Sequence, residues 1–230
     1  MRWVRDLTGR FAQRPHFETG ELDAECERLV TEFLKKRCGT VTFPISNDDL
    51  QVLVEEHASD LDLYADLSDR GDDVEGVTVF ERDGRPRVLI AKHLSEQPWS
   101  HNRLRTTLTH ELGHAHFHNL LYQVAEQPEL FSSDVGTRPQ PECHRDQMHT
   151  LSTVDWMEWQ AGYACGAFLI PRSHALKVVR HMRDVNTSEA IPNETSVLGQ
   201  GIITEVATTF DTSKDASRVR LIQLGYVLKG

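Results

Sequence analysis

The sequence lacks the features of several large protein classes. It has only four cysteines, without CxxC spacing, which are too few for a disulfide framework. No stretch approaches the ~18 consecutive apolar residues that a membrane-spanning helix needs, and the longest uncharged apolar-rich run, residues 160–171, contains two glycines. Charged residues occupy the opening of the chain, where a signal peptide would need its apolar segment. We therefore expect a cytoplasmic protein without membrane association.

Basic residues are also scarce relative to acidic ones. The chain has 25 Lys and Arg against 35 Asp and Glu, a net charge of -10, which argues against direct binding to nucleic acid. The excess is local, because residues 48–75 contain eleven acids and one base, Arg70. This acidic segment is interpreted either as a solvated face that aids solubility, which we favour, or as a docking surface for a basic partner.

The rest of the composition is that of an ordinary folded domain. Apolar residues make up 39% and charged residues 26% of the chain, and 230 residues allow one main core with an appendage. Apolar periodicity predicts a helix at residues 22–36, and capping and proline signals predict helices at 48–57, 101–121 and 155–170; the tail within 198–228 is interpreted as two short helices. Strands at residues 74–80 and 87–91 flank an Asp83–Gly84 turn and predict a β-hairpin. Residues 122–153 are rich in turn formers and predict a long loop.

The predicted helix at residues 101–121, with Ser100 as its expected cap, contains an HELGH motif. On a helix, His110 and His114 face the same side one turn apart, so that two imidazoles can bind one metal ion. Glu111 lies beside them, where a carboxylate can accept a proton from a metal-bound water. The alternative is an amphipathic helix with solvated histidines. Gly113 leaves room for another element to approach closely.

A hydrolytic zinc site needs a third protein ligand, and the local pattern does not settle which residue supplies it. Leu120 occupies the position of the third histidine in metzincins, which excludes that class. His116 and His118 are interpreted as histidines on the helix surface. Glu158, on the helix predicted at 155–170, is the better candidate. Its position also fits a capping box with Asp155, and the local pattern by itself favours the capping box.

Three parts of the chain together resemble one family. They are RTTLTHELGHAHFH, then Glu158-x-x-Ala161 followed by Leu169-Ile170-Pro171, and a closing segment from Ala207 to Gly225. In these motifs the chain, over about residues 88–228, resembles the ImmA/IrrE (DUF955) metallopeptidases. The departures from the family pattern are Thr109, Gly162, Ala164 and Ile170. They affect hydrogen bonding and packing around the site but not the ligands.

The resemblance implies an α+β fold with a zincin-like, gluzincin-type peptidase core, a small antiparallel sheet and a C-terminal helical segment. We accordingly expect an N-terminal helical segment at residues 1–40, the core at 41–185 and the closing segment at 186–230. The resemblance also assigns His110, His114 and Glu158 as Zn²⁺ ligands and Glu111 as the general base.

Other parts of the catalytic machinery are less defined by the sequence. Candidate donors to the oxyanion are Tyr122, His144, His149 and Tyr163. The strand at 87–91 is expected to pair with an extended substrate, as in zincins generally. Cys143 could in principle occupy the open zinc position, but an ordinary loop cysteine is the favoured interpretation.

The resemblance implies a zinc endopeptidase that cleaves a specific cytoplasmic protein, a helix-turn-helix transcriptional repressor, and the acidic segment would suit such a basic partner. A toxin with a peptidase fold, paired with an antitoxin, is an alternative that the sequence does not separate from it. A noncatalytic DNA-associated regulator is a third hypothesis. It is weak because the closing helices carry only three bases, Lys214, Arg218 and Arg220.

Overall fold

The structure is a computed structural model that describes residues 1–71, 73–81, 84–125, 142–144, 155–186 and 190–230. The chain is α+β, as predicted, and it divides into two compact units. Unit 1 comprises Met1–Glu21 and Asp48–Cys165, and unit 2 comprises Leu22–Asn47 and Gly166–Gly230. Each unit combines segments that are distant in the sequence, so the division differs from the three consecutive segments expected at 1–40, 41–185 and 186–230.

The N-terminal residues form a β-hairpin that the sequence did not predict. Strand β1 (Arg2–Arg5) pairs antiparallel with β2 (Gln13–His16). Asp6 closes the connecting loop, because its carboxylate accepts hydrogen bonds from the backbone N–H groups of Thr8 and Phe11. The expectation of a helical segment is therefore wrong for these residues and correct for the following helix, α1 (Thr19–Cys38).

Unit 1 contains a four-stranded sheet with the order β3-β5-β4-β6. Its strands are β3 (Asp60–Ala65), β4 (Gly76–Val79), β5 (Arg87–Ala91) and β6 (Glu142–His144). The predicted β4–β5 hairpin is confirmed, but β3 runs parallel to β5, so the sheet is mixed rather than antiparallel. Because β5 is paired on both sides, the prediction that it pairs with an extended substrate is wrong.

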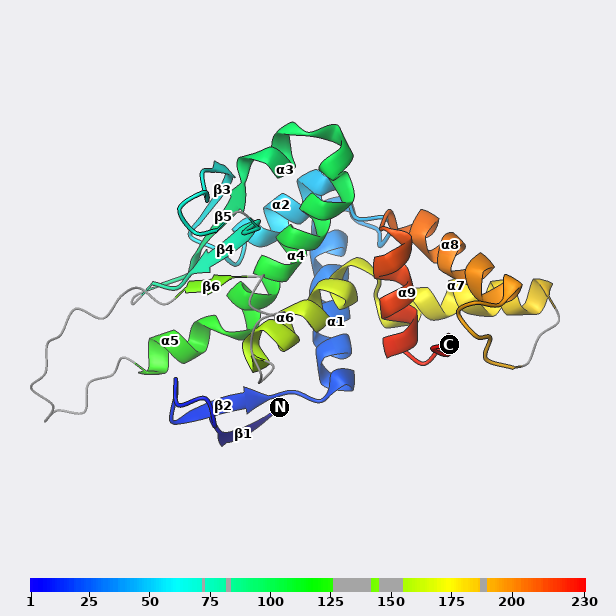
Figure 1. The fold of residues 1–230 in the computed structure, drawn as a ribbon, viewed down its shortest axis with the longest axis horizontal. Helices are drawn as coiled ribbons and strands as arrows, with labels where there is room; N and C mark the ends of the chain where they lie inside the picture. The colour runs from blue at the N-terminus through cyan, green and yellow to red at the C-terminus, as the bar shows by residue number, and fades with distance from the viewer. Residues whose placement is uncertain (72, 82–83, 126–141, 145–154, 187–189) are drawn as a thin grey trace, which may run out of the picture. The chain divides into compact units, whose positions relative to one another are not determined.

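Unit 1 contains several helices, and one of them is long, largely buried and next to the sheet. The helices are α2 (Asn47–Glu55), α3 (Lys92–Glu96), α4 (His101–Phe117), α5 (Asn119–Ala125) and α6 (Trp156–Leu169), whose last residues belong to unit 2. Figure 1 shows α4 between the sheet and α6. A Cβ built on Gly113 would lie 3.0 Å from the Cα of Ala161, which confirms that this glycine permits close helix packing. Ser100 precedes α4, but its side chain makes no capping hydrogen bond, so that prediction is wrong.

Unit 2 is helical in the residues that the structure describes. The two predicted closing helices are α8 (Val197–Phe210) and α9 (Lys214–Gln223), and the hydroxyls of Ser196 and Ser213 cap them. A further helix, α7 (Arg172–Val185), was not predicted. None of the helices in the described part of the chain combines the length and apolarity that crossing a membrane requires.

Candidate metal centre

Two helices of unit 1 bring the three predicted ligands together. His110 and His114 lie on α4 and Glu158 lies on α6, and all three side chains are buried. His110 Nε2 is 3.1 Å from both His114 Nε2 and Glu158 Oε2, and His114 Nε2 is 3.3 Å from Glu158 Oε1. Imidazole nitrogens and carboxylate oxygens are common metal ligands. The three residues therefore form a group that could hold a metal ion.

Glu158 takes no part in the capping box that was the alternative interpretation. Asp155 does cap α6, since its Oδ1 accepts from the N–H of Met157, but the Glu158 carboxylate contacts the two imidazoles instead. Burial by itself would raise the pKa of the Glu158 carboxyl. Attraction to His114 and hydrogen bonds with both histidines outweigh it and hold that pKa well below its usual range. Glu158 is therefore an anion facing the two histidines.

Glu111 lies beside the ligands and is held by the sheet. Thr78 on β4 donates its hydroxyl to Glu111 Oε2 at 2.7 Å, whereas Oε1 is buried without a hydrogen-bond partner among the described residues. A Cβ built on Gly76 would lie 2.6 Å from that Oε1, so any side chain at this position would displace the Glu111 carboxylate or its neighbours. Burial, with a smaller contribution from the Glu158 charge, raises the pKa of Glu111 against the opposing influence of His110, His114 and the Thr78 hydrogen bond. The carboxylate thus has one oxygen anchored and one available.

His118 is not on the helix surface, so that prediction is wrong. It follows the last residue of α4, is fully buried and lies behind His114, with the two Nδ1 atoms 3.0 Å apart. Its Nε2 is 3.1 Å from Gln160 Oε1 on α6. Burial, assisted by His114, lowers the pKa of His118 well below its usual value, so this ring is neutral. His116, by contrast, is only partly buried.

Two of the four predicted oxyanion donors, Tyr122 and Tyr163, have described side chains, and the contacts that define them involve other aromatic and sulfur-containing residues. The Tyr122 ring stacks on Phe80 with centroids 4.0 Å apart, and its hydroxyl contacts Met157 Sδ. Tyr163 is buried and its ring lies beside Trp159. His149 and the side chains of His144 and Cys143 lie outside the described residues.

Three residues that support the site were missed from the sequence: Gly76, Thr78 and Gln160. Thr78 is the polar residue of the strand GVTV, and its complete burial is a signal that periodicity alone does not give. Gln160 is 1% exposed on a helix that is otherwise apolar around it. A polar residue inside such a segment could have been noted as needing a buried partner.

Comparison of the chain with family models, with curated proteins and with solved structures finds no match.

Proposed function

We propose that the protein is a zinc-dependent endopeptidase with His110, His114 and Glu158 as metal ligands and Glu111 as general base. The observation that carries the proposal is that two imidazoles and one carboxylate lie together in the protein interior. Beside them lies a second carboxylate, Glu111, one oxygen of which has no hydrogen-bond partner among the described residues. Two histidines and one glutamate with an open fourth position form a known ligand set of catalytic zinc in peptidases.

The spacing of the ligand atoms supports zinc. In a tetrahedral site with bonds of 2.0–2.1 Å, neighbouring ligand atoms are about 3.3 Å apart. The three distances here are 3.1, 3.1 and 3.3 Å. The two distances to Glu158 involve different carboxylate oxygens, and one ligand atom from each of the three residues lies within 4.8 Å of the other two, which is close enough for a shared ion.

Zinc bound there would polarise a substrate carbonyl and lower the pKa of a bound water from about 15.7 to about 7. The residues of the chain supply the proton transfers. Glu111 would accept a proton on Oε1 as the water oxygen attacks the peptide carbonyl, and would pass it to the leaving amine as the C–N bond breaks. Thr78 would fix the carboxylate by continuing to donate to Oε2.

We further propose a protein substrate of the kind that the family resemblance suggests, a helix-turn-helix repressor or an antitoxin. The alternative of a DNA-associated regulator is weakened by the closing helices. Arg220 is buried against Asp23, and Arg218 pairs with Glu194 at 2.8 Å and with Asp215 at 3.5 Å. Two of the three bases are therefore engaged in ion pairs.

The test uses zinc-loaded protein and a peptide library prepared from a digested proteome, with cleavage sites read by mass spectrometry. Glu111→Gln is the matched control because it preserves size and the acceptor oxygen but removes the base. We expect bound zinc in both proteins and cleavage slower by about 10²–10⁴-fold in the variant. Equal cleavage by both proteins would refute the role of Glu111, and a zinc-loaded wild type that cleaves neither the library nor basic helix-turn-helix repressors added as whole proteins would refute the peptidase.

A further inference from the structure

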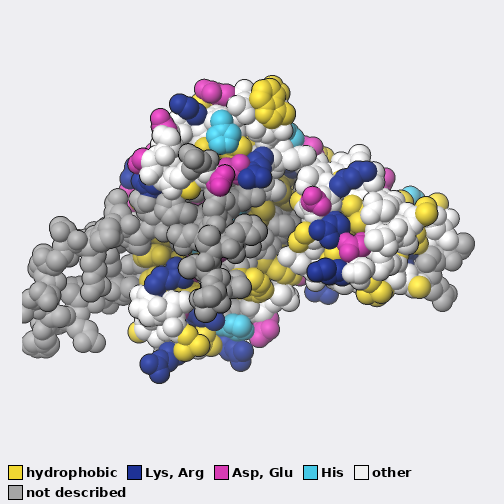
Figure 2. Space-filling model, viewed as in Figure 1, with side chains coloured by type: hydrophobic (Ala, Val, Ile, Leu, Met, Phe, Trp, Pro, Cys, Tyr) yellow, Lys and Arg dark blue, Asp and Glu magenta, His cyan; other side chains and the backbone are white. Residues whose placement is uncertain are grey.

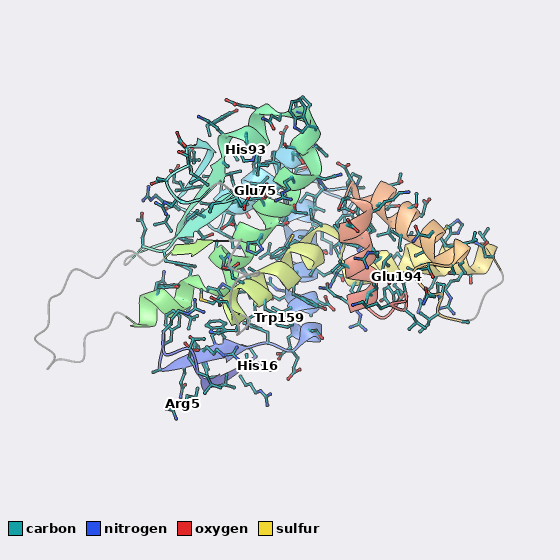
Figure 3. All side chains as sticks on the ribbon, in the orientation of Figure 1. Arg5, His16, Glu75, His93, Trp159 and Glu194 are labelled. Carbon is teal, nitrogen blue, oxygen red and sulfur yellow. The ribbon has the colours of Figure 1, made fainter. Side chains whose placement is uncertain are left out.

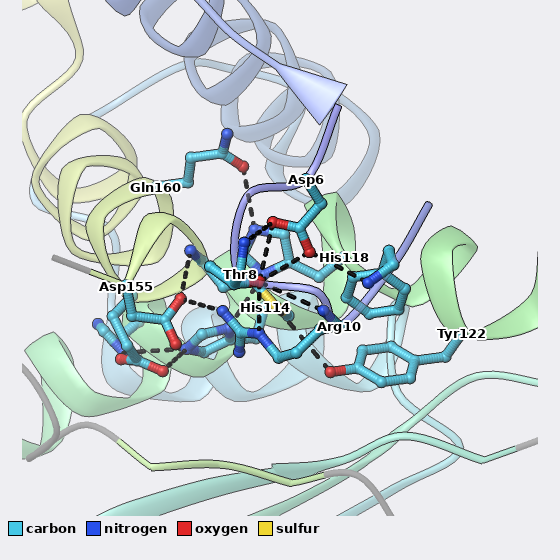
Figure 4. A network of polar contacts seen from close by, with 12 residues as sticks. Asp6, Thr8, Arg10, His114, His118, Tyr122, Asp155 and Gln160 are labelled. Atoms are coloured by element: carbon cyan, nitrogen blue, oxygen red, sulfur yellow. Dashed lines mark hydrogen bonds and ion pairs between the residues drawn. The ribbon is translucent and has the colours of Figure 1, made fainter. Parts of the chain in front are cut away.

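A chain of three buried hydrogen bonds runs from His114 to the N-terminal hairpin. Figure 4 labels its members His114, His118 and Gln160. His114 Nδ1 lies 3.0 Å from His118 Nδ1, and His118 Nε2 lies 3.1 Å from Gln160 Oε1. Gln160 Nε2 then donates to the carbonyl oxygen of Pro15 on β2 at 3.1 Å. His114, His118 and Gln160 are at most 1% exposed, and Pro15 is buried as well.

The chemistry of the last member fixes the direction of every bond. A proline has no N–H and offers only its carbonyl oxygen, so the amide nitrogen of Gln160 must face Pro15. The amide oxygen of Gln160 therefore faces His118 and accepts from its Nε2–H. A neutral imidazole carries one N–H, so His118 Nδ1 presents a lone pair. His114 must then donate through Nδ1–H, so Nε2, which faces Glu158 and His110, is the nitrogen left to bind a metal ion.

We propose that this chain, anchored on the backbone of the N-terminal hairpin, selects the metal-binding tautomer of His114, with His118 and Gln160 as positioning residues. The inference rests on the proposed metal site and names the residues that prepare one of its ligands. Metal-binding histidines commonly donate their second N–H to an outer partner, and loss of that partner typically costs 10–100-fold in metal affinity. Here the partner is a neutral histidine, and the chain ends on a peptide carbonyl.

The N-terminal hairpin also contacts the start of α6, so the hydrogen bond between Gln160 on α6 and Pro15 on β2 joins two elements that are already held together. Arg10, in the loop between β1 and β2, pairs with Asp155 at 2.6 Å, directly before the first residue of α6 (Figure 4). The guanidinium groups of Arg10 and Arg14 also lie 5.8 and 5.1 Å from the Trp156 ring centroid. These contacts of Arg10 and Arg14 with Asp155 and Trp156 therefore help to hold the Pro15 carbonyl in place relative to Gln160.

The first experiment measures zinc affinity by competition with a chromophoric chelator. We expect His118→Phe and Gln160→Met to weaken zinc binding about 10–100-fold. His118→Phe removes the acceptor for His114 and keeps a ring of similar size, whereas Gln160→Met removes the acceptor for His118 and keeps a side chain of similar length. His118→Asn is the conservative rescue, since an amide oxygen near the Nδ1 position can still accept from His114. It should bind zinc more tightly than His118→Phe. His116→Phe is the control, because His116 is only partly buried and contacts the rings of His57 and Phe117 instead.

Zinc affinity separates positioning from mere packing. If His118→Phe lowered the melting temperature but bound zinc within twofold of the wild type, His118 would be a core residue only, and the proposal would be overturned. Cleavage activity does not enter this measurement. A protein that binds zinc and cleaves nothing would refute the proposed peptidase while leaving the positioning chain intact.

The second experiment reads the tautomers directly in the folded wild type, so it does not depend on any variant. Long-range ¹H–¹⁵N correlation of the imidazoles should show His118 protonated on Nε2, both with and without zinc. In the zinc-loaded protein His114 should be protonated on Nδ1. A His118 ring that carries its proton on Nδ1, or is doubly protonated at neutral pH, would reverse or break the chain and refute the proposal.

Discussion

Two buried clusters of charged side chains, one in each unit, differ in how their members are satisfied. In unit 2, Arg220 donates to Asp23 Oδ1 at 2.6 Å and to the carbonyl of Ile170 at 3.2 Å. In unit 1, His110, His114 and Glu158 bring nitrogen and carboxylate oxygen atoms to within 3.1–3.3 Å of one another. The first cluster contains its own cation, whereas the second is a set of ligand atoms suited to a cation from outside the chain.

Burial alone does not distinguish these clusters. Asp23 and Arg220 are 5% and 1% exposed, and the three residues of unit 1 are at most 3% exposed. The donor and acceptor types make the difference, because a guanidinium opposite a carboxylate forms a complete ion pair. This comparison predicts that losing one member should destabilise the fold in unit 2 but impair metal binding in unit 1.

The largest effect is expected for Asp23→Ala. It leaves Arg220 as a buried charge without its carboxylate and should lower the free energy of unfolding by about 3–5 kcal/mol. Urea denaturation measures this loss. Glu32→Ala is the control, since Glu32 pairs with Arg28 on the surface and such pairs contribute only about 0–1 kcal/mol. Equal losses in the two variants would show that the buried pair does not stabilise unit 2.

Glu158→Gln should act mainly on metal binding. It retains a side chain that can hydrogen-bond to the imidazoles but removes the anionic ligand, so we expect zinc affinity to fall by more than ~100-fold, beyond the usual loss for an outer partner. Isothermal calorimetry of the refilled apoprotein measures the affinity. Full zinc affinity in this variant would remove Glu158 from the ligand set.

The same variant has a defined pH dependence in the metal-free protein. The folded state lowers the pKa of Glu158 below its ordinary value of 4.5. Its ionised form therefore stabilises the fold above about pH 4.5, and this contribution disappears as the pH falls through the lower folded pKa. The stability difference between wild type and Glu158→Gln should accordingly shrink in acid. A difference that grows as the pH falls would contradict the assignment of an ionised Glu158.

Gly76→Ala should have a smaller effect, centred on Glu111. The added Cβ would lie 2.6 Å from Glu111 Oε1 and 2.7 Å from Thr107 Cγ2, and such overpacking costs about 1–3 kcal/mol. Cleavage should also slow, because the free oxygen of Glu111 is displaced. Gly20→Ala is the control, since nothing lies within 4 Å of that position. Wild-type stability and activity in Gly76→Ala would mean that Glu111 has room to move.

The sequence predicted the helices that carry the site, because α4 has leucines at one-turn spacing and α6 is apolar along most of its length before Pro171. The spacing in HELGH likewise placed His110, Glu111 and His114 correctly on one helix. The residues that support Glu111 and His118 could not be predicted, since Thr78 lies 33 residues from Glu111 and Gln160 lies 42 residues from His118. Such contacts depend on how the sheet and helices pack, which local patterns do not encode.

Two errors have the same physical origin. His118 was placed on the surface because histidine is polar, and Arg220 was counted among bases that could contact DNA. Both side chains are buried because a specific partner satisfies them, Gln160 in one case and Asp23 in the other. A single sequence reveals polarity but not the partner that offsets the cost of burying it.

The acidic segment offers a third set of charges, and its exposure distinguishes it from both clusters. Asp48, Asp60, Asp66, Asp69 and Asp73 are among its exposed members. Glu75 is different, because it is buried and accepts from Arg103 Nε at 2.6 Å beside α4 (Figure 3), so it is not a free surface charge. On the face shown in Figure 2, acidic and basic side chains are interspersed rather than gathered into one patch. Surface charges of this kind contribute little to stability.

The smallest effect is therefore expected for the triple variant Asp60→Lys, Asp69→Lys and Asp73→Lys. Stability should change by no more than about 0.5 kcal/mol and zinc content should stay the same, because the three side chains are exposed and none belongs to the metal group. If the substrate is a basic helix-turn-helix protein, its association rate should fall at low salt. The difference should shrink as salt rises, since exposed charges are screened beyond ~8 Å at physiological ionic strength. Stopped-flow association with a basic helix-turn-helix repressor at two salt concentrations measures both effects, and equal rates in both would identify the segment as a solvated face.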